Sequence, residues 1–328
     1  MKPYWILNPG RISEASVNLF LIFIFYFSKM KPTLLILAAG MASRYGSMKQ
    51  VDGFGPNNET IIDYSIYDAI RAGFGKVSFI IREEFEENFR SIFDPKLKGK
   101  IETDYVFQNL DLKPFGIDKE IERQKPWGTG HAVLAARNQV NEPFCVINAD
   151  DFYGYDAFEK MAKFLTTEVR DDNYSLIGYE VDKTLSDYGS VSRGICQVGA
   201  DGNLKEIVER TKVYLKDGKI VNEEDNGSIT ALAEDSRASM NFWGFTPAVF
   251  KQSESMFKEF ALANENNPKS EFFIPLVAEQ LVKSGEANFK VIPTSSKWFG
   301  VTYKEDKPIV QKSLSKLIEN GTYPERLW

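Results

Sequence analysis

Small and cationic residues follow an apolar stretch near the start of the chain. Residues 34–38 carry no charge and run into Ala39, Gly40 and Met41, with Arg44 and Lys49 close behind. An apolar run of this kind predicts a buried central strand, and a thin loop lets backbone N–H groups approach a polyphosphate. The two cations can neutralise that polyphosphate. The stretch therefore predicts nucleotide or other phosphate chemistry, which several classes of enzyme share.

A second pair of motifs lies further along the chain. Residues 128–132, GTGHA, form another small-residue loop ahead of an apolar helix, and the apolar run 144–147 ends in NADD at residues 148–151. On their own, Asp150 and Asp151 fit a solvated turn or a helix cap as well as a functional site. They place two carboxylates at a second predicted strand end.

The elements around these motifs predict an α/β fold. Thr60 and Asp63 form a capping box for a helix that stops at Gly73, and residues 76–81 form the next strand. Strand, helix and strand in this order predict a parallel sheet, whose carboxyl edge is where phosphate ligands bind. We expect the first loop to lie at that edge.

The rest of the pattern extends this arrangement. Between 182 and 239, glycine turns separate short alternating runs, including 204–208 and 211–215, which predicts an antiparallel insertion. A polar loop is expected at 109–126. Further helices are expected at residues 83–93, 132–136, 155–165, 248–263 and 305–319, and one more is expected to begin after a cap at Ser270. Further strands are expected at residues 105–108, 175–179, 240–245 and 289–292.

Composition limits the possible functions. The length of 328 residues suits roughly two domains, or one large domain with an insertion. The net charge of −6 argues against a nucleic-acid-binding protein, because such proteins are usually basic. Cys145 and Cys196 sit in apolar or strand-like contexts, which predicts free, buried thiols and a cytoplasmic protein.

Residues 1–29 differ from the remainder. The apolar run 19–27 is nine residues long, whereas a membrane span needs about 20, and no small-residue cleavage site follows it. Although a signal peptide is conceivable, we favour Met30 as the functional start and residues 1–29 as a non-core extension. We then expect a catalytic domain at 30–304 and a terminal helix and tail at 305–328.

The first loop resembles a family signature. LAAGMASRYGSMKQ is similar to the LxxGxGxR loop and following lysine of the sugar-1-phosphate nucleotidyltransferases, also called NDP-sugar pyrophosphorylases. Leu37, Gly40 and Arg44 match, while Ala42 replaces the second glycine and Met48 the usual proline. GTGHA resembles the second nucleotide loop of the family's uridylyltransferases, and NADD falls where the family has its metal-binding aspartate. The resemblance extends over residues 31–306.

The resemblance implies a Rossmann-like, mostly parallel sheet flanked by helices, with an antiparallel sugar-binding subregion. It also implies that a nucleoside triphosphate, here UTP by preference, reacts with a sugar 1-phosphate and Mg²⁺. This reaction needs no enzyme nucleophile, in keeping with a single histidine and no triad signature. The implied catalytic residues are Arg44, Lys49 and the metal ligand Asp150; the nucleotide-binding residues are Ala39, Gly40, Met41, Gln108 (with Gln124 as the alternative), Gly128 and Thr129; the sugar-phosphate-binding residues are Gly189, Glu209 and Asn241.

One position departs from the family pattern. An aspartate that joins the metal site commonly stands two residues after a tryptophan, but here Trp298 is followed by Phe299 and Gly300. Either one protein carboxylate suffices, or Asp151 or Asp306 compensates, or activity is lost.

Other functions stay open. The alternatives are a cytidylyltransferase acting on a polyol phosphate or phosphocholine, a glycosyltransferase of related fold, and a nucleotide-sugar-binding module without catalysis. The sequence does not select the sugar, the base or the oligomeric state, and an oligomer is possible.

Overall fold

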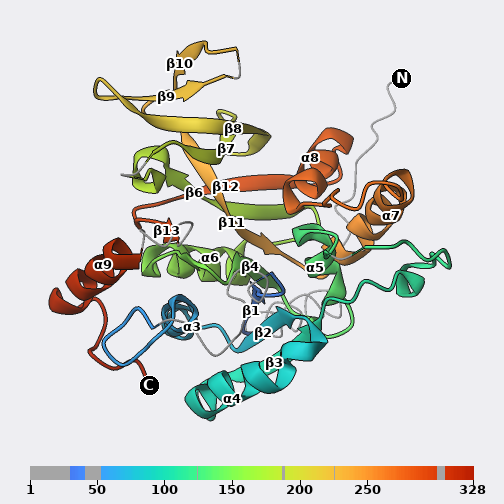
Figure 1. Ribbon diagram of the computed structural model, residues 1–328, viewed down its shortest axis with the longest axis horizontal. Helices are drawn as coiled ribbons and strands as arrows, with labels where there is room; N and C mark the ends of the chain where they lie inside the picture. The colour runs from blue at the N-terminus through green and yellow to red at the C-terminus, as the bar shows by residue number, and fades with distance from the viewer. Residues whose placement is uncertain (1–29, 41–52, 124, 187–188, 225, 301–306) are drawn as a thin grey trace, which may run out of the picture.

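The computed structural model describes residues 30–40, 53–123, 125–186, 189–224, 226–300 and 307–328. It confirms the predicted α/β class: an eleven-stranded mixed sheet carries helices on both faces, and a separate two-stranded sheet lies beside it (Figure 1). The strands are β1 (Thr33–Leu37), β2 (Lys76–Ile81), β3 (Glu102–Phe107), β4 (Phe144–Asn148), β5 (Asp151–Phe152), β6 (Asn173–Glu180), β7 (Val191–Val198), β8 (Leu204–Lys216), β9 (Lys219–Glu223), β10 (Ile229–Ala231), β11 (Arg237–Phe245), β12 (Asn288–Thr294) and β13 (Phe299–Gly300). The helices are α3 (Ile61–Ala72), α4 (Glu86–Leu97), α5 (Thr129–Ala135), α6 (Tyr155–Thr167), α7 (Ala248–Ala263), α8 (Ile274–Ser284) and α9 (Lys307–Glu319).

Four parallel strands form the part of the sheet that the first half of the chain predicts. Their order is β3, β2, β1, β4, and β1 pairs with both β2 and β4. The predicted capping box is present, because Thr60 and Asp63 bond each other's backbone N–H groups at the start of α3. The carboxyl ends of these four strands therefore lie along one edge.

Strand β11 joins this parallel part to the antiparallel part. It runs antiparallel to β4, β6 and β7, and its register with β6 shifts between Ser239 and Trp243. Beyond β7, the strands β8, β9 and β10 continue the same sheet, at the top of Figure 1. The predicted antiparallel region is thus an extension of the main sheet.

Several expected boundaries differ from those in the structure, and two of them concern the antiparallel part. The runs 204–208 and 211–215 belong to one strand, β8, because Glu209 and Arg210 pair in register with Gly194 and Arg193 of β7 and do not interrupt the strand. The strand expected at 240–245 likewise begins earlier, at Arg237, because its first residues already pair with β6 and β7.

The expected cap at Ser270 is also wrong. Helix α8 begins at Ile274, whose N–H donates to the Thr129 hydroxyl over 3.2 Å. Ser270 accepts a hydrogen bond from the Arg123 guanidinium instead. A residue 145 positions away thus supplies the cap, which no local pattern reveals.

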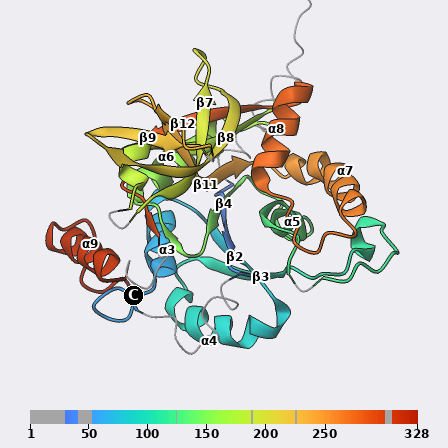
Figure 2. The same cartoon turned by 45° about the horizontal axis from the view of Figure 1, so that its top comes forward.

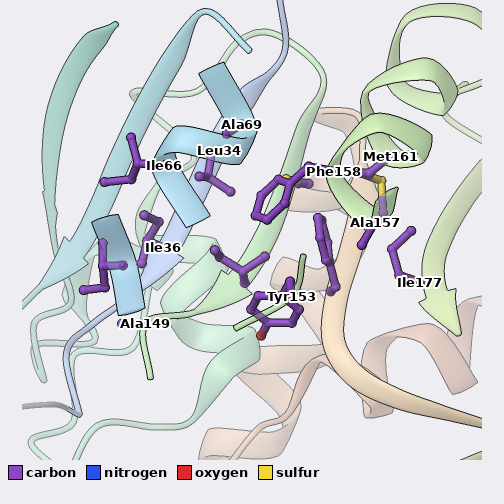
Figure 3. Close-up of a cluster of buried hydrophobic side chains, with 14 of the residues drawn as sticks. Leu34, Ile36, Ile66, Ala69, Ala149, Tyr153, Ala157, Phe158, Met161 and Ile177 are labelled. Carbon is purple, nitrogen blue, oxygen red and sulfur yellow. The ribbon is translucent and has the colours of Figure 1, made fainter. Parts of the chain in front are cut away.

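The hydrophobic core has one layer on each face of the sheet. Leu34 and Ile36 of β1 pack with α3 and α6, where Figure 3 shows Ile66, Ala69 and Phe158 beside them. The opposite layer is covered by α5, α7 and α8, which lie together on the other side of the sheet in Figures 1 and 2. Both faces of the parallel strands are therefore buried, as their continuous apolar runs predict.

A third cluster anchors the end of the chain. Helix α9 and the last residues pack on α3 and on the β5–β13 pair, with Tyr64, Phe152 and Phe299 between them. The Tyr323 hydroxyl donates to Asp68 over 2.7 Å, and the Trp328 indole N–H donates to Asp63 over 2.9 Å.

Cys145 and Cys196 are both free and buried, as expected. Among the described residues, no helix combines the length and hydropathy required to cross a bilayer.

Candidate functional site

One cavity of about 1020 Å³ collects most of the predicted site residues that the structure describes. Residues that follow β1, β3 and β4 line it at the carboxyl edge of the parallel strands, where the topology predicts phosphate ligands. Residues of β7, β8 and β11 line its other part. The predicted residues on its wall are Ala39, Gly40, Gln108, Gly128, Thr129, Asp150, Glu209 and Asn241.

Other predicted residues are not placed on this wall. Met41, Arg44 and Lys49 lie outside the described residues, as do the alternative base contact Gln124, Asp306 and the extension 1–29. Gly189 is described, but it is not among the cavity-lining residues. It forms an isolated bridge with Ser186 instead.

The second loop is held tightly against a remote segment. Gly128 has φ +95°, and a Cβ there would lie 2.8 Å from the carbonyl oxygen of Phe272. The Gly130 N–H donates to that carbonyl over 2.8 Å, and the Phe272 N–H donates to the Trp127 carbonyl over 2.6 Å. Only glycine allows this approach, so the loop's position depends on the absence of a side chain at residue 128.

Gln108 is buried directly behind this loop. Its Nε2 donates to the Gly128 carbonyl over 3.1 Å and lies 3.2 Å from Nδ1 of His131. The His131 ring stacks on Phe257 with centroids 4.7 Å apart. Burial, followed by the nearby charges of Arg137 and Arg123, lowers the pKa of His131 to about 3, so its imidazole is neutral at pH 7.

The two adjacent aspartates after β4 face different surroundings. Asp150 lines the cavity. The carboxylate of Asp151 is buried and accepts from the Asn148 amide over 2.9 Å and lies 3.2 Å from the Tyr153 hydroxyl. Burial and then the neighbouring charge of Asp150 raise the pKa of Asp151 to about 7.

Gly300 stands opposite Asp151 in the small sheet. The two residues pair in the β5–β13 ladder, and a Cβ on Gly300 would lie 2.6 Å from Oδ1 of Asp151. The Asp151 carboxylate thus occupies the space that a side chain at residue 300 would need. The ring of Trp298 is 2.9 Å from the same point.

An amide network links the aspartates to the antiparallel part. The Asn241 amide donates to Asn148 over 2.6 Å, and the Trp243 indole donates to the Asn241 oxygen over 2.9 Å. Asn241 sits at φ +61° within the register shift of β11, and this conformation turns the strand at the cavity wall. The network fixes the side chains of Asn148 and Asn241 relative to each other.

Glu209 is the predicted site residue that belongs to strand β8 of the antiparallel part. It lines the cavity opposite Gly194, and burial raises the pKa of its carboxyl group. Its neighbour Arg210 forms an ion pair with Glu224 over 2.5 Å. Glu209 and Arg210, which are adjacent in the sequence, therefore have different surroundings. Glu209 lines the cavity, and the Arg210 guanidinium binds the Glu224 carboxylate.

Sequence reasoning missed several residues of the wall. Arg82 directly follows β2, so the strand-end argument already contained the signal that would find it. Asn148 belongs to NADD but drew less attention than the aspartates. Lys125, Ser239 and Glu271 also line the cavity, and no local pattern distinguishes them.

The fold and the cavity together define an α/β protein with a ligand cavity at the carboxyl edge of its parallel strands, where such folds bind phosphate ligands. The nucleotidyl transferase family model matches residues 34–306, and the chain belongs to this family. The predicted enzyme class, nucleotidyltransferase, is thereby confirmed.

Solved structures agree with the fold. The chain is similar to the inositol-1-phosphate CTP transferase from T. maritima, with 14% identity, a TM-score of 0.57, and coverage of 88% of this chain and 97% of that one. It is also similar to a UDP-glucose pyrophosphorylase complexed with UDP-glucose, with 17% identity, a TM-score of 0.55, and coverage of 88% and 99%. No curated protein matches the chain.

Proposed function

We propose that the protein transfers a nucleotidyl group from a nucleoside triphosphate, UTP by preference, to a sugar 1-phosphate, giving an NDP-sugar and pyrophosphate. The observation that supports this most strongly is the single cavity shared by the strand-end residues and by β7, β8 and β11. Such a cavity has room for a nucleotide and an acceptor side by side.

The reaction we propose needs alignment and charge neutralisation. An oxygen of the sugar phosphate attacks the α-phosphorus, the bond between the α-phosphorus and its bridging oxygen to the β-phosphorus breaks, and pyrophosphate leaves. Because the attacking oxygen is already anionic, no side chain has to remove a proton. In this proposal Arg44 and Lys49 neutralise the triphosphate, while Gln108, Gly128 and Thr129 hold the base.

Asn241 and Glu209 are placed to meet the acceptor. Asn241 is oriented by Trp243, and its neighbour Ser239 lines the same wall. The Glu209 carboxylate lies in partly buried surroundings, where it can accept from sugar hydroxyls. We keep Gly189 in the proposed acceptor set with less direct support, because it does not line the cavity.

The donor set around Asp150 suits Mg²⁺. Among the described residues, no three His, Cys, Asp or Glu side chains converge on a common point, and Mg²⁺ typically uses one or two carboxylates with phosphate and water oxygens. Asp150, with Asp151 next to it, would hold the ion. When bound, it would screen the charge of the phosphates.

A second candidate is a cytidylyltransferase for a polyol phosphate or phosphocholine. The glutamates on the cavity wall favour phosphocholine, because its quaternary ammonium would find four carboxylates there: Glu206, Glu209, Glu271 and Glu279. The T. maritima protein, named for inositol 1-phosphate and CTP, is in keeping with the other acceptor of this candidate, an anionic polyol phosphate. A nucleotide-sugar-binding module without catalysis is the remaining alternative. The cytoplasmic location also stays a proposal, supported by the two free thiols.

The test is pyrophosphate release from UTP, CTP or dTTP with glucose 1-phosphate, N-acetylglucosamine 1-phosphate, an inositol phosphate or phosphocholine, each with Mg²⁺. We expect release with UTP and a sugar 1-phosphate. Release only with CTP and a polyol phosphate or phosphocholine would favour the second candidate. Nucleotide binding without release from any pair would contradict the enzymatic proposal.

A further inference from the structure

We propose that His131, the chain's single histidine, holds the Gln108 side-chain amide in one orientation and thereby makes the site prefer uracil or thymine over cytosine. The inference rests on the proposed function, because it takes Gln108 as a contact of the nucleobase. His131 acts through Gln108 and is a positioning residue.

The orientation of the Gln108 amide follows from its two neighbours. The Gly128 carbonyl, 3.1 Å away, accepts hydrogen bonds only, so the nitrogen of the amide must face it. The second hydrogen on that nitrogen then points to Nδ1 of His131, 3.2 Å away. Nδ1 is consequently the unprotonated nitrogen of the imidazole, and the ring proton is on Nε2.

Both neighbours are themselves fixed. Gly128 is held by the Phe272 segment, which leaves its carbonyl little freedom. The His131 ring is only 2% exposed and packs against Phe257, at 4.7 Å, and Phe115, at 5.4 Å between centroids. The amide nitrogen of Gln108 therefore meets two acceptors that cannot readily turn away.

One polar atom of Gln108 remains for a ligand. Within the described part of the chain, Oε1 has no hydrogen-bond partner, and Gln108 lines the cavity. Because both hydrogens of the nitrogen are engaged, the side chain presents an acceptor and no donor to the cavity. A base that offers an N–H at this point is favoured.

The pyrimidines differ at N3, which we take to be the base atom that faces Oε1. Uracil and thymine carry a hydrogen on N3, which can donate to Oε1. Cytosine has an unprotonated N3, which would face Oε1 as a second acceptor. A free glutamine could rotate its amide to suit cytosine, but here rotation would turn Oε1 toward the Gly128 carbonyl and toward Nδ1, leaving acceptors opposed.

Two variants separate the acceptor from the ring. His131→Asn keeps an acceptor near the position of Nδ1 but loses the stacking on Phe257, whereas His131→Phe keeps an aromatic ring and removes the acceptor. The measurement is calorimetric titration of the full-length wild type and both variants with UTP and with CTP, each with Mg²⁺. The ratio of the two Kd values does not depend on the fraction of active protein, and thermal unfolding reports any loss of stability.

We expect the wild type to bind UTP at least about tenfold more tightly than CTP. We expect His131→Asn to keep most of this ratio and His131→Phe to reduce it to about twofold or less. An unchanged ratio in His131→Phe, or loss of the ratio in His131→Asn, would overturn the inference. Binding of neither nucleotide by the wild type would overturn the proposed function itself.

A second measurement needs no substrate. Because the chain has one histidine, selective ¹⁵N-histidine labelling gives one pair of ring nitrogen signals. We expect a neutral imidazole at pH 7 with its proton on Nε2. A ring protonated at Nδ1 would contradict the role of His131 even if the protein bound nucleotides and released pyrophosphate.

Discussion

At the scale of single residues, two neighbouring aspartates have separate places. Asp150 lines the cavity, while Asp151 is turned toward Asn148 and Tyr153. In the sequence, only the family resemblance separates Asp150, the implied metal ligand, from Asp151. The pairing of β5 with β13 distinguishes them, because it gives Asp151 a fixed neighbour in Gly300.

The proposed mechanism gives a first prediction. Asp150→Asn and Lys49→Ala should each lower kcat by about 100-fold or more, since each removes a charge that acts on the phosphates in the transition state. Pyrophosphate release is the measurement. The matched controls are Asp217→Asn in the β8–β9 turn and Lys219→Ala at the start of β9; both residues are exposed, and both variants should keep wild-type rates. A variant of Asp150 or Lys49 with wild-type turnover would remove that residue from the mechanism.

At the scale of elements, the loop before α5 depends on the segment before α8. The loop contributes Gly128 and Gly130, and the segment contributes the backbone of Phe272. Thr129 adds the cap of α8, so its hydroxyl serves the fold as well as lining the cavity. The nucleotide side of the cavity is therefore built jointly by two helix starts.

A second prediction tests this contact. Gly128→Ala should lower the free energy of unfolding by about 2 to 4 kcal/mol, because the new Cβ meets backbone atoms and φ is positive. It should also weaken UTP binding. The control is Gly218→Ala, which has φ +75° with no atom within 4 Å; it should cost about 1 kcal/mol and leave binding unchanged. Urea unfolding and calorimetric titration measure both effects, and equal losses in the two variants would contradict the close approach at Gly128.

Local signals predicted the elements whose causes are local. The apolar run of β1, the capping box at Thr60 and the glycine stop at Gly73 are all readable within a few residues of the element they define. The strand-end argument expected ligand residues at the carboxyl edge, and Asp150 and Gln108, the latter implied by the resemblance, both line the cavity there.

Local sequence patterns could not predict contacts between residues that are far apart in the chain. The cap of α8 by Thr129 joins residues 145 positions apart, and the bond from Trp328 to Asp63 joins residues 265 apart. Side-chain direction within NADD was equally hidden, because it depends on a strand, β13, of two residues.

At the scale of the whole molecule, the end of the chain returns to its first helix. The Tyr323 hydroxyl donates to Asp68, which is fully buried and also pairs with Arg71 over 2.5 Å. Burial is the largest influence and raises the pKa of Asp68 to about 6, even though both partners act in the opposite direction. The folded protein therefore holds a proton on Asp68 more firmly than the unfolded chain does.

This linkage gives a third prediction. Since the native pKa is raised from 3.8 to about 6, the folded state binds more protons between these values, and the contribution of Asp68 to stability decreases as pH rises through them. From pH 4 to pH 7, the wild type should lose about 2 kcal/mol relative to Asp68→Asn, which has no titrating group there. Urea unfolding of both proteins across this range measures the difference, and parallel pH profiles would contradict the raised pKa.

The opposition of Asp151 and Gly300 also constrains how this protein can evolve. A mutation that introduced a carboxylate at residue 300 would first encounter the carboxylate already present, 2.6 Å from its Cβ. Such a change therefore requires that the Asp151 carboxylate turn away or that residue 151 become smaller. Substitutions at residues 151 and 300 are therefore expected to be coupled.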